Sequence, residues 1–191
     1  MRYGTFLSVT YNDFTHNGKK HIITKKKDVT DKNIPGYYLA SIIYGPSYLS
    51  FECALAYYSL IPETVYTYTS ATFEKKKAKQ YENPFGAYTY RDVPSKAYPL
   101  GVNLYHENGY SYQIASAEKA VCDQLYIVSP VNNQKELEKL LFDDLRIDSD
   151  EFFRMNLSDL LEISSNYRAQ NHKLLQAYTC LLYTSPSPRD S

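Results

Sequence analysis

Four side chains offer this sequence its best material for catalysis: Glu52, Glu118, Lys119 and Asp123. Carboxylates that converge with a lysine can hold a divalent cation and stabilise the charge that develops during phosphodiester cleavage. Each of the four also has a structural explanation. The glutamates stand in Ser-x-Glu sequences that favour helix starts, and Lys119 and Asp123 have the spacing of a surface ion pair one helical turn apart. We favour the structural explanation.

Other patterns typical of enzymes are missing from the sequence. The seven glycines form no phosphate-binding loop, and there is no GxSxG nucleophile elbow. The histidines lack metal-ligand spacing, and we interpret His106, beside a turn, as a surface strand residue. We therefore predict no catalytic, metal-binding or cofactor-binding residue, no cofactor and no enzymatic activity.

The cysteines point to a reducing compartment. There are three, Cys53, Cys122 and Cys180, without CxxC spacing or a nearby pair of histidines. Cys53 and Cys122 lie in apolar helical patterns, where cysteine is usually a small core residue. No signal sequence is recognisable and no apolar run has the length of a membrane span, so we expect a cytoplasmic protein.

The net charge of the chain is zero, but its first half is basic and its second half is acidic. Residues 1–100 contain 13 Lys and Arg and 8 Asp and Glu, whereas residues 101–191 contain 8 and 13. The densest basic stretch comprises Lys75, Lys76, Lys77 and Lys79. These lysines can contact nucleic-acid phosphates, although a solvated loop is the interpretation we favour.

Tyrosine is the most unusual feature of the composition, with 21 residues against 8 Phe and no Trp. Its ring is apolar and its hydroxyl polar, which suits half-buried strands and interfaces. Residues 63–72 alternate in the manner of a strand, and residues 87–93 are expected to form a second strand. Residues 100–106 and 110–115 flank the Asn108-Gly109 turn and are expected to form a hairpin.

Helices are expected on both sides of these strands. Ser50 and Ser116 each precede an apolar helical stripe and are expected to cap it. Beyond residue 130, one helix contains Leu137, Leu140 and Leu141, a second spans 157–163 with Asn156 as its cap, and a third runs from 166 to about 178. The sequence predicts an α+β fold, with a mainly antiparallel or mixed sheet packed by helices and a helical C-terminal part.

Three segments are expected along the chain. Residues 1–33 predict a hairpin, with strands at 6–11 and 19–23 and a turn at Asn17-Gly18. Residues 34–179 form the main domain. Residues 180–191 resemble one translation frame of a transposase adapter used in sequencing libraries, and their two prolines cannot continue a helix. We expect this tail to be disordered.

Three ordered sequence blocks resemble AbiEi-family antitoxins. Residues 45–70, GPSYLSFECALAYYSLIPETVYTYTS, are similar to the family pattern PSYIS-x-ESAL-x-YYGLIPE-x-VYT-x-TS. Residues 84–91, PFGAYTYR, and 114–126, IASAEKAVCDQLY, are similar to its TPFG-x-F-x-YR and IASPEKALLDLLY blocks. The family-signature residues in this chain are Ser50, Glu52, Leu60, Pro62, Glu63, Ser116, Glu118, Lys119 and Asp123.

The resemblance implies a protein-binding function. Such antitoxins belong to type IV toxin–antitoxin systems, some of which act in abortive infection and phage defence. Their C-terminal domain counteracts a nucleotidyltransferase-like toxin encoded nearby, and an N-terminal winged helix acts as a DNA-binding transcriptional regulator at the operator. The family offers no catalytic residues to transfer.

This sequence departs from the family in places. Only residues 1–33 precede the main domain, and we interpret their hairpin as a remnant of the wing. We therefore rank operator DNA behind the toxin as a partner. Ser59 and Ala117 stand where the family has Gly and Pro. Two alternatives remain open: a nucleic-acid-binding regulator without antitoxin activity, and a nuclease-like enzyme.

Overall fold

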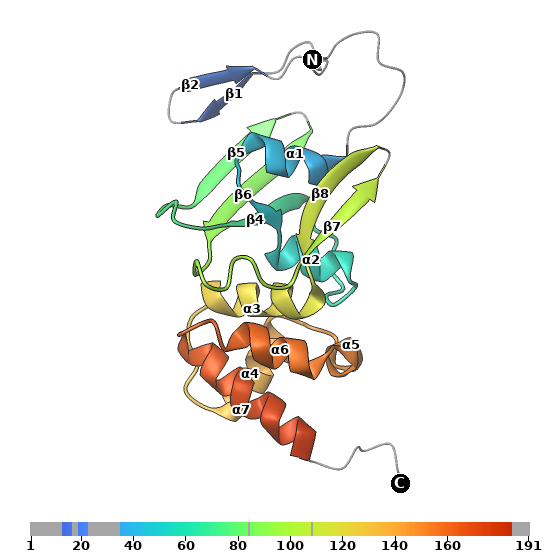
Figure 1. Cartoon of the computed structure of the whole chain (residues 1–191), viewed down its shortest axis with the longest axis vertical. Helices are drawn as coiled ribbons and strands as arrows, with labels where there is room; N and C mark the ends of the chain where they lie inside the picture. Colours follow the sequence, from blue (N-terminus) through green and yellow to red (C-terminus); the bar gives the residue numbers. More distant parts are fainter. Residues whose placement is uncertain (1–12, 17–18, 23–34, 84, 108, 185–191) are drawn as a thin grey trace, which may run out of the picture.

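One helix, α3 (Ala117–Ile127), lies between a sheet-containing half and a helical half of the molecule (Figure 1). The computed structural model describes residues 13–16, 19–22, 35–83, 85–107 and 109–184. The α+β class, the mixed sheet and the helical C-terminal part are all as the sequence predicts. In this described part of the chain, no helix combines the length and apolarity needed to cross a membrane.

The main sheet has six strands in the order β5-β6-β4-β3-β8-β7. Their bounds are β3 (Tyr48–Leu49), β4 (Thr67–Thr72), β5 (Lys79–Asn83), β6 (Gly86–Asp92), β7 (Val102–Glu107) and β8 (Tyr110–Ala115). Strands β5/β6, β3/β4 and β7/β8 pair antiparallel, whereas β4/β6 and β3/β8 pair parallel. The parallel pairs join segments far apart in the sequence and make the sheet mixed.

Two strand predictions need correction. The expected strand at 63–72 begins only at Thr67, and Glu63 instead forms an ion pair with Arg146 of the helical half. The basic stretch, expected to be a loop, ends in an additional edge strand, since Lys79 starts β5 and pairs with Tyr90. The hairpin of β7 and β8 is confirmed, with Val102 opposite Ala115.

Helices α1 (Gly36–Ile43) and α2 (Phe51–Tyr57) pack against the sheet. Helix α1 buries Leu39 and Ala40, and the Tyr90 hydroxyl on β6 donates to the Ala40 carbonyl at 2.6 Å. Helix α2 buries the apolar stripe predicted for it, including Cys53 and Leu55, and it joins the sheet to α3.

The helical half consists of α4 (Gln134–Lys139), a π-helical turn η1 (Leu140–Asp144), α5 (Ser149–Arg154), α6 (Leu157–Ser164) and α7 (Gln170–Thr184). Side chains cap three of these helices. Asn133, Asp148 and Asn156 accept backbone N–H groups in the first turns of α4, α5 and α6, and the Asn156 cap is the one predicted.

The ends of the chain differ from expectation. Helix α7 continues to Thr184, so residues 180–184 belong to the fold although the sequence assigned them to a disordered tail. The prolines of that tail lie further on, and residues 185–191 are outside the described residues. Near the start, β1 (Asp13–His16) and β2 (Lys19–Ile22) form an antiparallel pair. The strand expected at 6–11 also lies outside the described residues.

Two neighbouring tyrosines on β6 provide a test of this packing. Tyr90 and Tyr88 are both buried, but the Tyr88 hydroxyl has no hydrogen-bond partner among the residues that the structure describes. Tyr90→Phe should lower the free energy of unfolding by about 1–3 kcal/mol, because it removes the hydroxyl that donates to the buried Ala40 carbonyl. Tyr88→Phe should be neutral or stabilising, because it removes a buried hydroxyl that makes no hydrogen bond. Urea denaturation of both variants measures this difference, and an equal loss of stability would contradict it.

Candidate functional site

Lys119 and Asp123 form a buried ion pair in the middle of α3. The Lys119 Nζ lies 3.0 Å from Asp123 Oδ1, and both side chains are 0% exposed. The prediction of a surface pair was wrong. Helix α3 is covered by the sheet half on one side and by α6 and α7 on the other, so its polar side is buried together with its apolar stripe.

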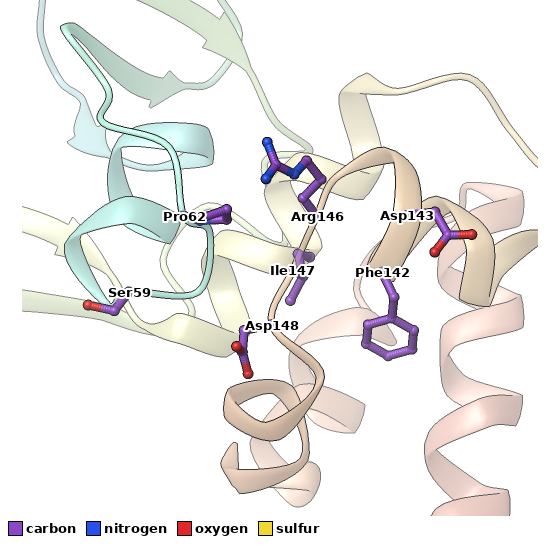
Figure 2. Close-up of a pocket in the computed structure, with 7 residues that line it drawn as sticks. All are labelled: Ser59, Pro62, Phe142, Asp143, Arg146, Ile147 and Asp148. Atoms are coloured by element: carbon purple, nitrogen blue, oxygen red, sulfur yellow. The ribbon is translucent and has the colours of Figure 1, made fainter.

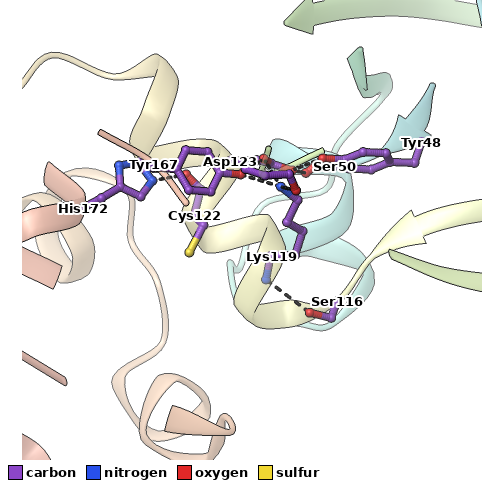
Figure 3. Close-up of polar contacts among 9 residues, drawn as sticks. Tyr48, Ser50, Ser116, Lys119, Cys122, Asp123, Tyr167 and His172 are labelled. Atoms are coloured by element: carbon purple, nitrogen blue, oxygen red, sulfur yellow. Dashed lines mark hydrogen bonds and ion pairs between the residues drawn. The ribbon is translucent and has the colours of Figure 1, made fainter. Parts of the chain in front are cut away.

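Four donors surround the Asp123 carboxylate (Figure 3). At Oδ2, the Tyr48 hydroxyl donates at 3.0 Å and the Ser50 hydroxyl at 2.6 Å. At Oδ1, the Tyr167 hydroxyl donates and the Lys119 ammonium forms its ion pair. Both oxygens are therefore fully satisfied, which a buried charge requires. We name these five residues the buried polar cluster.

Lys119 is satisfied as completely as its partner. Besides Asp123, its ammonium donates to the Ala97 carbonyl at 2.8 Å and to the Tyr167 hydroxyl at 2.5 Å. The ammonium also lies 4.9 Å from the centre of the Tyr167 ring, within the range of a cation–π contact. Three N–H bonds and three acceptors leave Lys119 no donor for a substrate.

Ser50 belongs to this cluster and does not cap its helix. Helix α2 starts directly after it, as predicted, but the Ser50 side chain donates to Asp123. Thr69 on β4 acts in its place, because its hydroxyl accepts the Cys53 N–H at 3.0 Å and donates to the Ser50 carbonyl at 2.6 Å. Ser116 caps α3 as predicted, with its hydroxyl accepting the Lys119 N–H at 3.2 Å.

The two glutamates bond to different partners. Glu52 Oε1 accepts from Gln124 Nε2 at 3.0 Å, and Glu118 Oε1 accepts from the Asn156 N–H at 3.0 Å. Among the described residues, no group of three or more His, Cys, Asp or Glu is placed to hold a metal ion. The candidate carboxylate–lysine set is thus not brought together at an accessible site.

Two further residues, Tyr167 and His172, were missed by the sequence analysis. Their rings stack at 4.1 Å, and His172 Nε2 donates to the Cys122 carbonyl at 2.9 Å. Burial raises the pKa of Tyr167, and the charge of Asp123 raises it further. Burial lowers the pKa of His172 to about 4, which keeps the ring neutral. The sequence holds one sign that this side of α3 is buried, because the three residues between Lys119 and Asp123 are all apolar.

The signature residues Leu60, Pro62 and Glu63 lie together at a second place, where the chain leaves α2. Leu60 is buried, and its carbonyl accepts the Asp148 N–H at 2.8 Å. Pro62 lines an open pocket of about 570 Å³ (Figure 2). The exposed Glu63 forms an ion pair with Arg146, which also lines this pocket. The pocket is lined by Ser59, Pro62, Phe142, Asp143, Arg146, Ile147 and Asp148.

The four candidate lysines have different surroundings. Lys75 lies over the Tyr44 ring, with Nζ 5.3 Å from its centre, and Lys79 is half-buried at the start of β5. Lys76 and Lys77 are exposed. His106, on β7, is an exposed strand residue as predicted. The basic stretch therefore presents two fully exposed cations instead of four.

Comparisons with known proteins add no assignment. No model of a known protein family matches the chain, and no curated protein matches it either. Function must therefore be inferred from the residues and their geometry.

Removing one member of the buried ion pair should be costly. Lys119→Met and Asp123→Leu should each lower the free energy of unfolding by about 3–5 kcal/mol, because each leaves an unpaired buried charge. The double variant should lose clearly less than the sum of the two. Urea denaturation measures the cycle, with exposed Lys135→Met as the control. Ser50→Ala, expected to cost about 1–3 kcal/mol, is a milder probe if the others do not fold. Additive losses would contradict a mutual interaction.

His172 should make stability depend on pH. Its pKa is about 4 in the folded chain and near 6.5 ordinarily, so below pH 6.5 the unfolded chain takes up a proton that the folded chain does not. Stability should fall by up to about 3 kcal/mol as the pH falls from 6.5 to 4. Comparing unfolding of wild type and His172→Phe across this range isolates the effect. Identical pH profiles would rule it out.

Proposed function

We propose that this chain is a cytoplasmic antitoxin module of a type IV toxin–antitoxin system that counteracts a nucleotidyltransferase-like toxin by protein contact. The proposal starts from the three blocks at 45–70, 84–91 and 114–126, which resemble AbiEi-family antitoxins. A reducing compartment is in keeping with Cys53 and Cys122, which are buried thiols without a disulfide.

One observation carries most of the support. The first and last blocks, some 70 residues apart, meet in the buried polar cluster, where Ser50 donates to Asp123. Four of the five cluster residues lie within these two blocks: Tyr48, Ser50, Lys119 and Asp123. Since Lys119 and Asp123 are fully buried and fully bonded, their chemistry stabilises a scaffold and does not face a substrate.

Among the nine signature residues, Pro62 and Glu63 are the exposed ones. Pro62 lines the 570 Å³ pocket, and Glu63 forms an ion pair with Arg146, which lines it together with apolar Phe142 and Ile147. A partner's apolar side chain can enter such a pocket while its polar groups exchange with the Glu63–Arg146 pair at the rim. We infer that this pocket is the centre of the toxin-binding surface.

Co-expression tests the proposal. The wild-type chain should restore growth to cells that express the nucleotidyltransferase-like gene encoded beside it. Glu63→Arg should abolish this rescue and the co-purification of the two proteins, because it places two like charges at the rim. Glu82→Arg, which makes the same change at an exposed position of β5, should rescue as the wild type does. Thermal unfolding should show both variants folded, since exposed ion pairs contribute about 0–1 kcal/mol.

Two outcomes would reject the proposal at different levels. Failure of the wild-type chain to restore growth would reject the antitoxin function. Rescue by Glu63→Arg that equals the wild type would reject the pocket as the contact surface.

The alternative of a nucleic-acid-binding regulator rests on the basic stretch. With Lys76 and Lys77 as its exposed cations, the expected dependence of DNA affinity on salt is shallow, with a log–log slope of about −2 at most. A steep slope with operator DNA, lost in Lys76→Gln/Lys77→Gln, would favour this alternative.

A further inference from the structure

A second pocket, of about 440 Å³, lies near the buried polar cluster on the side of the β6–β7 loop. Three separate segments form its walls: residues 94–96 after β6, Tyr126 near the end of α3, and residues 166–169 between α6 and α7. Its lining residues are Pro94, Ser95, Lys96, Tyr126, Asn166, Arg168 and Ala169. Apolar surface exceeds polar surface in these walls, as in most small-molecule sites.

The charges around this pocket favour an anion. Lys96 and Arg168 both line it, come from opposite halves of the molecule and are exposed. No carboxylate of the described residues lines the pocket, although Glu74 accepts from the lining Ser95 hydroxyl at 3.1 Å. Two cationic side chains that line one pocket suit a doubly charged group such as a phosphate.

The start of α7 adds to this positive potential. Helix α7 has 15 residues, begins directly after the lining residue Ala169 and carries no acidic residue in its first turn. A helix of this length presents partial positive charge and backbone N–H groups at its N-terminus. The helix end and the two cationic side chains therefore favour the same kind of ligand.

An aromatic side chain, Tyr126, also lines this pocket. The Tyr126 side chain is 39% exposed, and its ring packs on Tyr167 with the ring centres 5.7 Å apart. The ring is therefore held by the buried polar cluster and still offers surface to a ligand. A planar apolar group can stack on it while a phosphate reaches the cations.

We propose that this pocket binds a nucleoside phosphate, with the base against Tyr126 and the phosphate between Lys96 and Arg168. The site lies apart from the pocket at Pro62 and does not depend on the antitoxin function. Because the ligand contacts the β6–β7 loop, α3 and the start of α7, it links the two halves that α3 separates (Figure 1). Binding should stabilise the assembled fold against unfolding.

Calorimetric titration of the whole chain with AMP, adenosine and inorganic phosphate tests the proposal. AMP should bind at least about tenfold more tightly than adenosine or phosphate, because it alone uses both the cations and the ring. AMP should also raise the thermal midpoint, and the midpoint should keep rising with the logarithm of the AMP concentration once that concentration exceeds the dissociation constant. Lys96→Gln/Arg168→Gln should weaken AMP binding by at least about tenfold and leave adenosine unchanged. Tyr126→Ala should weaken AMP and adenosine alike and leave phosphate unchanged.

The matched control is Lys135→Gln/Lys139→Gln, which removes the same charge from exposed positions of α4. It should bind AMP as the wild type does. Equal AMP affinity in the pocket variant and the wild type would overturn the proposal, as would equal weakening in the control. So would affinity for a single-stranded oligonucleotide that rises with its length and is lost in Lys76→Gln/Lys77→Gln, since it would assign the binding to a nucleic-acid surface.

Discussion

The fold depends on one charge pair that water does not reach. Burying Lys119 and Asp123 costs several kcal/mol for each ion unless geometry and hydrogen bonds compensate. Here the compensation comes from three regions: Tyr48 and Ser50 at the sheet, Ala97 in the loop after β6, and Tyr167 between α6 and α7. If one of these regions moves away, a buried charge loses a partner. The pair therefore sets the positions of the sheet, the central helix and the helical half relative to one another.

Local patterns predicted much of this architecture. Strand β6, the β7–β8 hairpin and the Asn156 cap are confirmed because each depends on neighbours within a few residues. Strand β5 was missed, because its single buried residue, Tyr81, stands among charged and polar residues that resemble a loop. The parallel pairing of β4 with β6 depends on contacts between distant residues, which a single sequence does not reveal.

The candidate site was predicted in its members but not in its environment. Lys119 and Asp123 were identified as neighbours, yet their spacing alone does not distinguish a surface pair from a buried one, since both place the groups one turn apart. Burial follows from the tertiary cover on both sides of α3, and Tyr167 and His172 arrive from some 45 residues away. Because α3 packs against α2, the Ser50 hydroxyl bonds to Asp123 and does not cap its own helix. Thr69 on β4 accepts the N–H group of Cys53 in the first turn of that helix.

The central position of α3 has a consequence for how the molecule assembles. Each half alone would expose one side of this helix to water, and the Lys119–Asp123 pair would keep only some of its hydrogen bonds. Neither half is then a self-sufficient folding unit, and partial unfolding at one end should propagate to the other through the shared wall. A shortened chain that stops before Tyr167 would therefore unfold less cooperatively throughout, and the sheet-containing half would not stay folded by itself. The two halves therefore form one cooperative folding unit.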